Sequence, residues 1–292
     1  MALIAALLRA LRRDLLSLQL PAGEPAERES SDRLGFLAMQ KVTAIGDDLE
    51  SIRRNDMANL KVKALVFDTF GTVVDWRGSM IAEGMTWGKA KGLNIDWAKF
   101  TDAWHNAYPA AMDKVRKGEI PWARLDDLNR MNLEDLLKQF NIAGISEEDK
   151  SQWSHVWRRL KPWPDSVEGL TRLKKKYIIA PLSNANIALM ANLAKFGGLP
   201  WDVILGAELA KHYKPDPETY LSAPYFLDLK PEEVMMCAAH VYDLQAARSH
   251  GLRTGFIYRP TEYGPGPADK ANPGDFDIVA SSLANLAQQL GV

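Results

Sequence analysis

Cysteine, net charge and long apolar runs are all scarce in this sequence of 292 residues. The single cysteine, Cys237, excludes an intrachain disulfide and is typical of a reducing compartment, so a cytoplasmic location is expected. A formal net charge of -1 gives no whole-chain basic field that would attract nucleic acid. Because no run of about 18 apolar residues occurs, no membrane-spanning helix and no membrane partner are expected. With 47% hydrophobic and 25% charged residues, the composition is that of an ordinary globular protein.

The first 60 residues differ in composition from the rest of the chain. Residues 1–20 show helical spacing of leucines, but arginines lie within and after the apolar run, whereas a secretory signal places them before it. Residues 21–60 are rich in Pro, Glu, Ser, Asp and Arg, which is typical of a flexible segment. Met57 precedes the first predicted strand, and three interpretations of residues 1–56 stay open: an over-extended translation start or dispensable extension, an amphipathic docking helix, or a targeting peptide.

A long helical region follows the first predicted strand, residues 64–67. Apolar residues recur there with helical spacing in four segments, which are 79–91, 96–116, 122–140 and 146–160. Seven of the nine tryptophans fall between Trp76 and Trp157, and most of them are expected to pack inside this region.

From residue 177 onward, strands alternate with helices of about 10–15 residues, a pattern that predicts a parallel sheet with helices on both faces. The predicted strands cover residues 177–182, 202–205, 234–237, 254–258 and 277–279. The fold class is therefore predicted to be α/β, with a Rossmann-like parallel sheet core and an inserted helical cap domain. The expected domains are an N-terminal extension (1–60), a core (61–76 and 161–292) and a cap (77–160).

Polar residues stand at the ends of four predicted strands. Parallel strands bring their carboxyl ends to one edge of a sheet, where α/β proteins bind ligands. The residues concerned are Asp68 and Thr72, Ser183 and Asn184, Lys214 and Tyr220, and His240 and Asp243. One such residue alone is more often a helix cap or a solvated charge, whereas four strand ends in the order Asp, Ser/Asn, Lys, Asp are far more specific.

This set of motifs resembles the haloacid dehalogenase superfamily, in particular the L-2-haloacid dehalogenases of the type II group. The resemblance covers about residues 61–290. It is carried by Asp68-Thr-Phe-Gly-Thr72, Ser183-Asn184-Ala185, Lys214-Pro-Asp-Pro with Tyr220, and Asp243 in its loop.

Two positions separate the branches of this superfamily. Its phosphatases use Asp-x-Asp, in which the second acid protonates the leaving group, but the residue two places after Asp68 is Phe70. The phosphatases also hold Mg²⁺ with an acid four residues before the position of Asp243, and that position is Ala239. Halide needs no proton to leave, so the resemblance implies carbon–halogen cleavage without a metal or other cofactor.

The resemblance implies covalent catalysis on a short 2-haloalkanoic acid. Asp68 attacks C2, halide leaves with inversion, and water then hydrolyses the Asp68 ester to give a 2-hydroxy acid. Asp243 orients or activates this water near Lys214, whose charge keeps Asp68 ionised. Thr72 orients Asp68. The residues expected to contact or enclose the substrate are Ser183, Asn184, Phe70, Tyr220 and Tyr242.

The chain departs from the family pattern in two places. Family members carry a cap arginine that cradles the halide, and the best local match is Trp104-His105, so His105 is expected to take this place; Arg116 and Arg124 are other candidates. His240 stands where better-known members have Asn, and it is expected to bond the hydrolytic water or to act as a base. Homodimers are common in the family, which is the basis for expecting one here.

Two other readings stay open. One is a superfamily phosphatase-like hydrolase with an altered, metal-poor site, whose activity chelation would abolish. The other is a non-catalytic binding protein that keeps the fold, which would release no halide from any haloacid.

Overall fold

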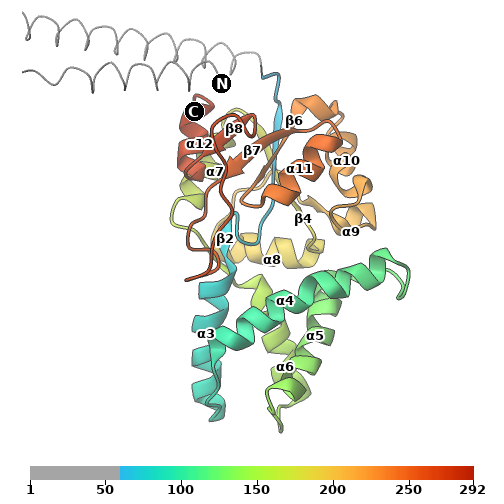
Figure 1. Cartoon of the computed structure of the whole chain (residues 1–292), viewed down its shortest axis with the longest axis vertical. Coiled ribbons are helices and arrows are strands. Elements are labelled where there is room, and N and C mark those ends of the chain that lie inside the picture. Colours follow the sequence, from blue (N-terminus) through green and yellow to red (C-terminus); the bar gives the residue numbers. More distant parts are fainter. Residues whose placement is uncertain (1–59) are drawn as a thin grey trace, which may run out of the picture. The chain divides into compact units, whose positions relative to one another are not determined.

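A computed structural model describes residues 60–292, in which six parallel strands form one sheet in the order β5-β4-β1-β6-β7-β8 (Figure 1). The strands are β1 (Ala64–Phe67), β4 (Ile178–Ser183), β5 (Leu205–Gly206), β6 (Val234–Ala238), β7 (Arg253–Ile257) and β8 (Ile278–Ala280). Every neighbouring pair is parallel, so the predicted parallel sheet is confirmed. The first strand lies in the middle, between β4 and β6, and its carboxyl end therefore opens at the centre of the sheet edge.

The central strand is buried on both faces, which explains its continuous apolar sequence. All four residues of β1 are fully buried. Successive side chains point to opposite faces, and Ala64 and Val66 belong to a core cluster that also contains Tyr220, Ala223 and Leu244. This cluster lies under the two helices α10 (Pro217–Phe226) and α11 (Val241–Ser249).

The remaining core helices lie around the sheet. The pair α7 (Ser166–Leu173) and α12 (Leu283–Gln289) pack together, and α12 also contacts β7 and β8. The other elements of this region are α8 (Ile187–Gly197), α9 (Ala207–Ala210) and the 3-10 helix η2 (Pro231–Glu233). Helices cover both faces of the sheet (Figure 1).

A group of helices is inserted between β1 and β4, as the sequence pattern predicts. It contains α3 (Trp76–Lys91), α4 (Trp97–Arg116), α5 (Leu125–Gln139), α6 (Glu147–Ser154) and the 3-10 helix η1 (His155–Arg158). Two short strands, β2 (Val74–Asp75) and β3 (Lys161–Pro162), lie before and after these helices. They pair antiparallel, so the two segments that connect the helices to the sheet lie side by side. Hereafter "the cap" means α3 to η1. The domain boundaries themselves stay a prediction.

The tryptophans of the cap pack together, as expected. Trp153 stacks on Trp87 with ring centroids 5.1 Å apart, and Trp97 meets Trp153 edge-on at 5.6 Å. Trp104 and Trp157 also meet edge-on at 6.0 Å. These rings give the cap an interior of its own, and each buried aromatic ring removes about 150–250 Å² from water.

The predicted strand at residues 202–205 is wrong in its position. The structure has only β5 at Leu205–Gly206, because Asp202 takes part in a different contact. Its carboxylate accepts a hydrogen bond from the backbone N–H of Ile179 at 2.9 Å and pairs with Lys174. The Asp202 backbone N–H also donates to Ile179 O at 2.9 Å, so Asp202 contacts β4 through both its backbone and its side chain, and regular strand pairing with β4 begins only at Leu205.

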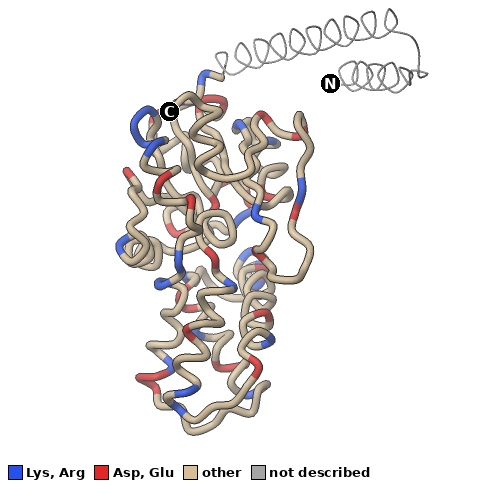
Figure 2. Tube along the Cα trace, turned by 90° about the vertical axis from the view of Figure 1, so that its left-hand side faces the viewer, with Lys and Arg blue, Asp and Glu red and all other residues tan. Residues whose placement is uncertain are grey.

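The predictions for residues 1–59 lie outside the described residues. Within residues 60–292, no helix combines the length and apolarity needed to cross a membrane. Lys and Arg are interspersed with Asp and Glu along the chain in the view of Figure 2.

Candidate active site

Asp68 directly follows the central strand, and a tight turn carries the chain away from it. The backbone N–H of Asp68 donates to Cys237 O at 3.0 Å, which fixes the residue against β6. The turn passes through Gly71, whose φ of +84° favours glycine. A Cβ at this position would also overlap the carboxylate of Glu262. Glycine is thus needed here both for the backbone conformation and for the space beside it.

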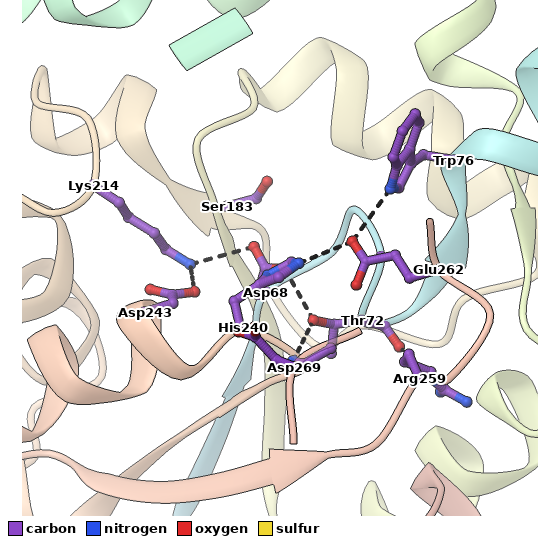
Figure 3. A network of polar contacts seen from close by, with 12 residues as sticks. Asp68, Thr72, Trp76, Ser183, Lys214, His240, Asp243, Arg259, Glu262 and Asp269 are labelled. Atoms are coloured by element: carbon purple, nitrogen blue, oxygen red, sulfur yellow. Dashed lines mark hydrogen bonds and ion pairs between the residues drawn. The ribbon is translucent and has the colours of Figure 1, made fainter. Parts of the chain in front are cut away.

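Thr72 ties the Asp68 turn to the end of β6. Its hydroxyl donates to Asp68 Oδ2 at 2.9 Å and accepts the backbone N–H of Ala239 at 2.8 Å. The Thr72 carbonyl accepts Arg259 Nε at 2.8 Å, and Arg259 in turn pairs with Asp165 at 2.6 Å. With its hydroxyl bonded on both sides, Thr72 limits the orientation of the Asp68 carboxylate (Figure 3).

Lys214 and Asp243 form a buried ion pair beside Asp68. Lys214 Nζ lies 2.7 Å from Asp243 Oδ2 and 3.5 Å from Asp68 Oδ1, and the Lys214 and Asp243 side chains are 4% and 2% exposed. The second oxygen of Asp243 accepts the Tyr220 hydroxyl at 2.6 Å. Asp243 also lies in the first turn of α11, where the helix dipole favours a negative charge. Each Asp243 oxygen therefore accepts one donor, which fixes the orientation of the carboxylate.

The position of Tyr220 differs from the predicted substrate contact. Its side chain is fully buried, and its hydroxyl points to Asp243. Burial raises the pKa of Tyr220, and the Asp243 charge adds to this effect, so the hydroxyl keeps its proton and donates. The geometry favours a role for Tyr220 in positioning Asp243.

The Asp68 carboxylate is held in its ionised form. Burial alone would raise its pKa, but the charges of Lys214 and His240 and the Thr72 hydrogen bond outweigh burial and lower the pKa to about 2. The side chain is 14% exposed, so it can still be reached from outside. The arrangement presents a buried, oriented and ionised carboxylate, which is what a nucleophile requires.

His240 lies between two carboxylates. Nδ1 is 3.2 Å from Asp68 Oδ2, an ion-pair contact that falls short of a well-aligned hydrogen bond, and Nε2 is 2.9 Å from Glu262 Oε1. Burial opposes a charge on the ring, but Asp68 and Glu262 outweigh it and raise the pKa of His240 well above 6.5. The two carboxylates thus favour the charged form of the ring beside Asp68.

Ser183 ends β4, on the other side of β1 from β6, and Asn184 follows it. The Ser183 hydroxyl accepts the backbone N–H of Ala185 at 3.2 Å, and Figure 3 shows it close to the network without a bond to it. The amide oxygen of Asn184 accepts the backbone N–H of Lys214 at 2.8 Å. Asn184 therefore fixes the loop that carries Lys214, a contact that the sequence does not reveal.

The two predicted apolar walls differ in exposure. Phe70 is buried and meets Trp157 of the cap edge-on, with ring centroids 5.2 Å apart. Tyr242 is 63% exposed and stacks on the His240 ring at 5.6 Å. Phe70 is thus part of the packing between the core and the cap, whereas Tyr242 lies over His240 at the surface.

His105 reaches the site from α4 of the cap. Its ring stacks on Trp76 with centroids 3.9 Å apart and an angle of 10° between the rings. Burial lowers the pKa of His105 to about 4, with the Glu262 charge opposing this shift, so the ring is neutral near pH 7. The residue expected to replace the halide-cradling arginine is therefore near the site but uncharged.

The two alternative arginines of the cap region form ion pairs with other residues. Arg116 pairs with Asp216 at 2.8 Å, and Arg124 pairs with Asp127 at 2.9 Å. Arg116 also lines a surface hollow of about 410 Å³ together with Trp122, and Asp68 does not line it. Both guanidinium groups are thus engaged by carboxylates.

Glu262 is the main site residue that the sequence reasoning missed. It lies in the loop after β7, and Oε1 accepts both His240 and the Trp76 indole N–H, at 2.9 and 3.2 Å (Figure 3). The four strand-end motifs do not include the predicted strand at 254–258, although polar residues follow that strand as well. Arg259 and Glu262 follow that strand directly, so this signal was present in the sequence.

Among residues 60–292, no group of three or more His, Cys, Asp or Glu side chains has an arrangement that could hold a metal ion. At the position discussed for a metal-binding acid, the chain has Ala239, whose backbone N–H is bonded to Thr72.

Comparisons with known proteins agree with this geometry. The chain is 29% identical over 216 residues to (S)-2-haloacid dehalogenase 4A of Burkholderia cepacia, covering 69% of this chain and 87% of that protein. Among solved structures, it is 48% identical to the L-2-haloacid dehalogenase PA0810, with a TM-score of 0.75 and coverage of 79% and 100%. It is 43% identical to a defluorinating L-2-haloacid dehalogenase, with a TM-score of 0.77 and coverage of 79% and 96%.

These likenesses confirm the resemblance that the four strand-end motifs indicated. A model of the haloacid dehalogenase-like hydrolases matches residues 62–251, which is more than half of the chain. The chain therefore belongs to the haloacid dehalogenase-like hydrolase family.

Proposed function

We propose that this protein is a hydrolase that removes halogen from short 2-haloalkanoic acids and releases 2-hydroxy acids. The observation that carries the proposal is the ionised Asp68 carboxylate, which lies between Lys214 and His240 with no second acid two residues on. The likeness to (S)-2-haloacid and L-2-haloacid dehalogenases supports the same reaction.

In the first half of the proposed reaction, an Asp68 oxygen attacks C2 in line with the carbon–halogen bond. The bond to halogen breaks, halide leaves with the electron pair, and C2 inverts as the ester forms. Phe70, two residues after Asp68, is buried and apolar and supplies no proton, and halide needs none to leave. Inversion would convert an (S)-2-haloacid into an (R)-2-hydroxy acid.

In the second half, water attacks the carbonyl carbon of the Asp68 ester. Asp243 takes the proton from this water and passes it to the departing hydroxy-acid oxygen. The buried position of Asp243 against Lys214 and Tyr220 supports this role, because both partners fix its orientation. Thr72 keeps Asp68 aligned in both halves.

The substrate carboxylate needs donors near Lys214. Ser183 at the end of β4 and the backbone N–H groups that follow it are proposed to supply them. Asn184 is proposed to contact the halide through its amide nitrogen, since its oxygen already accepts Lys214 N–H. Tyr242 stacks on His240 and covers it from outside.

A halide-release screen tests the reaction. Chloro-, bromo- and fluoroacetate and both enantiomers of 2-chloropropionate would be assayed with and without a chelator. Release of halide from one enantiomer, unaffected by the chelator, is the expected result. Activity that disappears on chelation would favour a metal-dependent hydrolase, and no release from any haloacid would favour a binding protein.

A single-turnover experiment in ¹⁸O water tests the ester. The first label should enter the Asp68 carboxylate, because water attacks the carbonyl carbon and the product keeps an oxygen of Asp68. Label that appears directly in the 2-hydroxy acid during the first turnover would contradict the assignment of Asp68 as nucleophile.

A further inference from the structure

Glu262 is a buried carboxylate that none of the roles above uses. Its side chain is 3% exposed, and the ion pairs of residues 60–292 give it one charged partner, His240. The Trp76 indole N–H, at 3.2 Å from Oε1, is a neutral donor. A carboxylate taken out of water is destabilising by several kcal/mol unless a cation lies against it. The burial of Glu262 thus favours a positive charge on His240.

The positions of the two ring nitrogens lead to the same conclusion. Nδ1 faces an oxygen of Asp68 at 3.2 Å, and Nε2 faces an oxygen of Glu262 at 2.9 Å. A neutral imidazole carries only one N–H, so one nitrogen lone pair would face a carboxylate oxygen. Only the imidazolium has a donor for each carboxylate.

The two oxygens of Asp68 have different surroundings. Oδ2 is contacted by Thr72 at 2.9 Å and by His240 at 3.2 Å, whereas Oδ1 has Lys214 at the longer distance of 3.5 Å. Oδ1 is therefore the freer oxygen to attack C2. In the resulting ester, Oδ2 becomes the carbonyl oxygen, with His240 and Thr72 beside it.

We propose that Glu262 is a positioning residue that holds His240 as an imidazolium, and that this imidazolium and the Thr72 hydroxyl stabilise the oxyanion on Asp68 Oδ2 during ester hydrolysis. The inference rests on the proposed ester mechanism. Donors aimed at the oxygen where charge develops give one of the largest single contributions to catalysis. The Nδ1 contact is poorly aligned in the free protein, and such contacts often tighten only in the transition state.

Ester hydrolysis needs no proton from His240. Water oxygen bonds to Asp68 Cγ, its proton goes to Asp243, and the carbonyl electron pair moves onto Oδ2. The pair then returns, the bond between Cγ and the substrate oxygen breaks, and that oxygen takes the proton from Asp243. The Asp68 carboxylic acid left behind releases its proton to solvent, and His240 stays an imidazolium throughout.

Several titratable side chains surround His240, and a titration must distinguish their ionisation from that of His240. Asp68 and Glu262 contact the ring nitrogens, and Tyr242 stacks on the ring. On the cap side, the His105 ring lies on Trp76, and its charge would oppose that on His240. Burial raises the pKa of Tyr263, which also bonds to Glu262.

The first test is nitrogen NMR of the folded full chain, which contains five histidines. His240 should have both ring nitrogens protonated at pH 7 and should lose the signal of this form only at higher pH. In Glu262→Gln, which keeps the shape and removes the charge, the titration midpoint should fall by about 1–3 pH units. A neutral His240 at pH 7 in the wild type, or an unchanged midpoint in the variant, would overturn the proposal.

The second test separates the two halves of the reaction by rapid-quench kinetics with 2-chloropropionate. Glu262→Gln should slow formation of the hydroxy acid by about 10–100-fold, leaving a burst of halide and an ester adduct visible by mass spectrometry. Equal slowing of the burst and of the hydroxy acid would overturn the oxyanion role.

The matched control is Glu134→Gln, which removes a carboxylate from the cap pair with Arg130 and Lys150 and should change neither rate. Hydroxy-acid formation in Glu134→Gln slowed as much as in Glu262→Gln would also overturn the specific role of Glu262. Direct entry of ¹⁸O into the product during the first turnover would instead refute the ester mechanism, while the NMR titration would still decide the ion pair.

Discussion

The edge of the sheet and the interior of the cap are held together by different means. At the sheet edge, the buried Lys214 lies within 3.5 Å of both Asp68 and Asp243. In the cap, tryptophan rings pack together, and the buried indole N–H groups of Trp104 and Trp153 have no hydrogen-bond partner among the described residues. The sheet edge therefore depends on matched charges, whereas the cap depends on filled volume.

This difference predicts whether a substitution reduces activity, stability or both. Removing one charge at the sheet edge leaves another charge buried without a partner, and this affects chemistry and stability together. Removing a ring from the cap leaves a cavity, and this affects stability alone. The predictions below test this separation, beginning with the largest expected effect.

Lys214→Met should damage both chemistry and stability. It removes the cation between Asp68 and Asp243, so halide release should fall by about 10²–10³-fold. The free energy of unfolding should fall by about 3–5 kcal/mol, because Asp243 is left unpaired. Urea unfolding and a halide assay would check both, with Lys138→Met at an exposed pair as the control. Retained activity would contradict the central place of Lys214.

Trp153→Ala should damage stability alone. Its ring is almost fully buried and packs against Trp87 and Trp97, so its loss should lower the free energy of unfolding by about 3–5 kcal/mol. The turnover number per folded molecule should stay within about threefold of the wild type. Tyr225→Ala, at a ring that is 79% exposed, is the control. A large loss of turnover in the folded variant would show that the two regions are coupled.

The acid side of the pH profile should report the lowered pKa of Asp68. Because this pKa is about 2, protonation of Asp68 should not reduce kcat/KM between pH 7 and pH 5. A carboxyl group whose pKa is lowered by folding stabilises the native state above its ordinary pKa of 3.8, and this stabilisation is lost as the pH falls toward 2. An activity midpoint near pH 5 in folded protein would contradict this electrostatic balance.

His105→Arg should have the smallest effect. An arginine in the place of His105 would add a permanent cation over Trp76, which opposes the charge on His240, but it should still raise turnover if this position contacts the halide. The gain should be about two- to five-fold, equivalent to about 0.5–1 kcal/mol. Steady-state halide release would measure it, with the exposed His212→Arg as the control. No gain, or a loss, would place the halide contact elsewhere.

The sequence predicts the sheet and most of the site because both follow from local patterns. The apolar run before Asp68 and the polar residues after four strands are visible as short motifs, and parallel strands necessarily bring their ends together. The edge strand β5 begins later than predicted, and the Asp202 side chain, not a strand carbonyl, accepts the backbone N–H of Ile179. Such a contact leaves no periodic signal.

The role of Tyr220 and the charge of His105 depended on tertiary contacts. Tyr220 stands in a recognisable motif, but only the fold shows that its hydroxyl bonds to Asp243. His105 was identified as a candidate, and only its stacking and burial show that the ring is neutral near pH 7. Burial and stacking partners are properties of the folded chain. A motif can therefore identify a candidate residue but not its protonation state.

Gly71 makes two distant positions interdependent in any attempt to vary this sequence. A side chain at this position would displace the Glu262 carboxylate, which would then no longer face His240. Random substitution at position 71 alone should therefore yield almost no active variants. A library that randomises positions 71 and 262 together could recover folded proteins, and the pairs that survive selection would show which combinations of side chains can replace the present one.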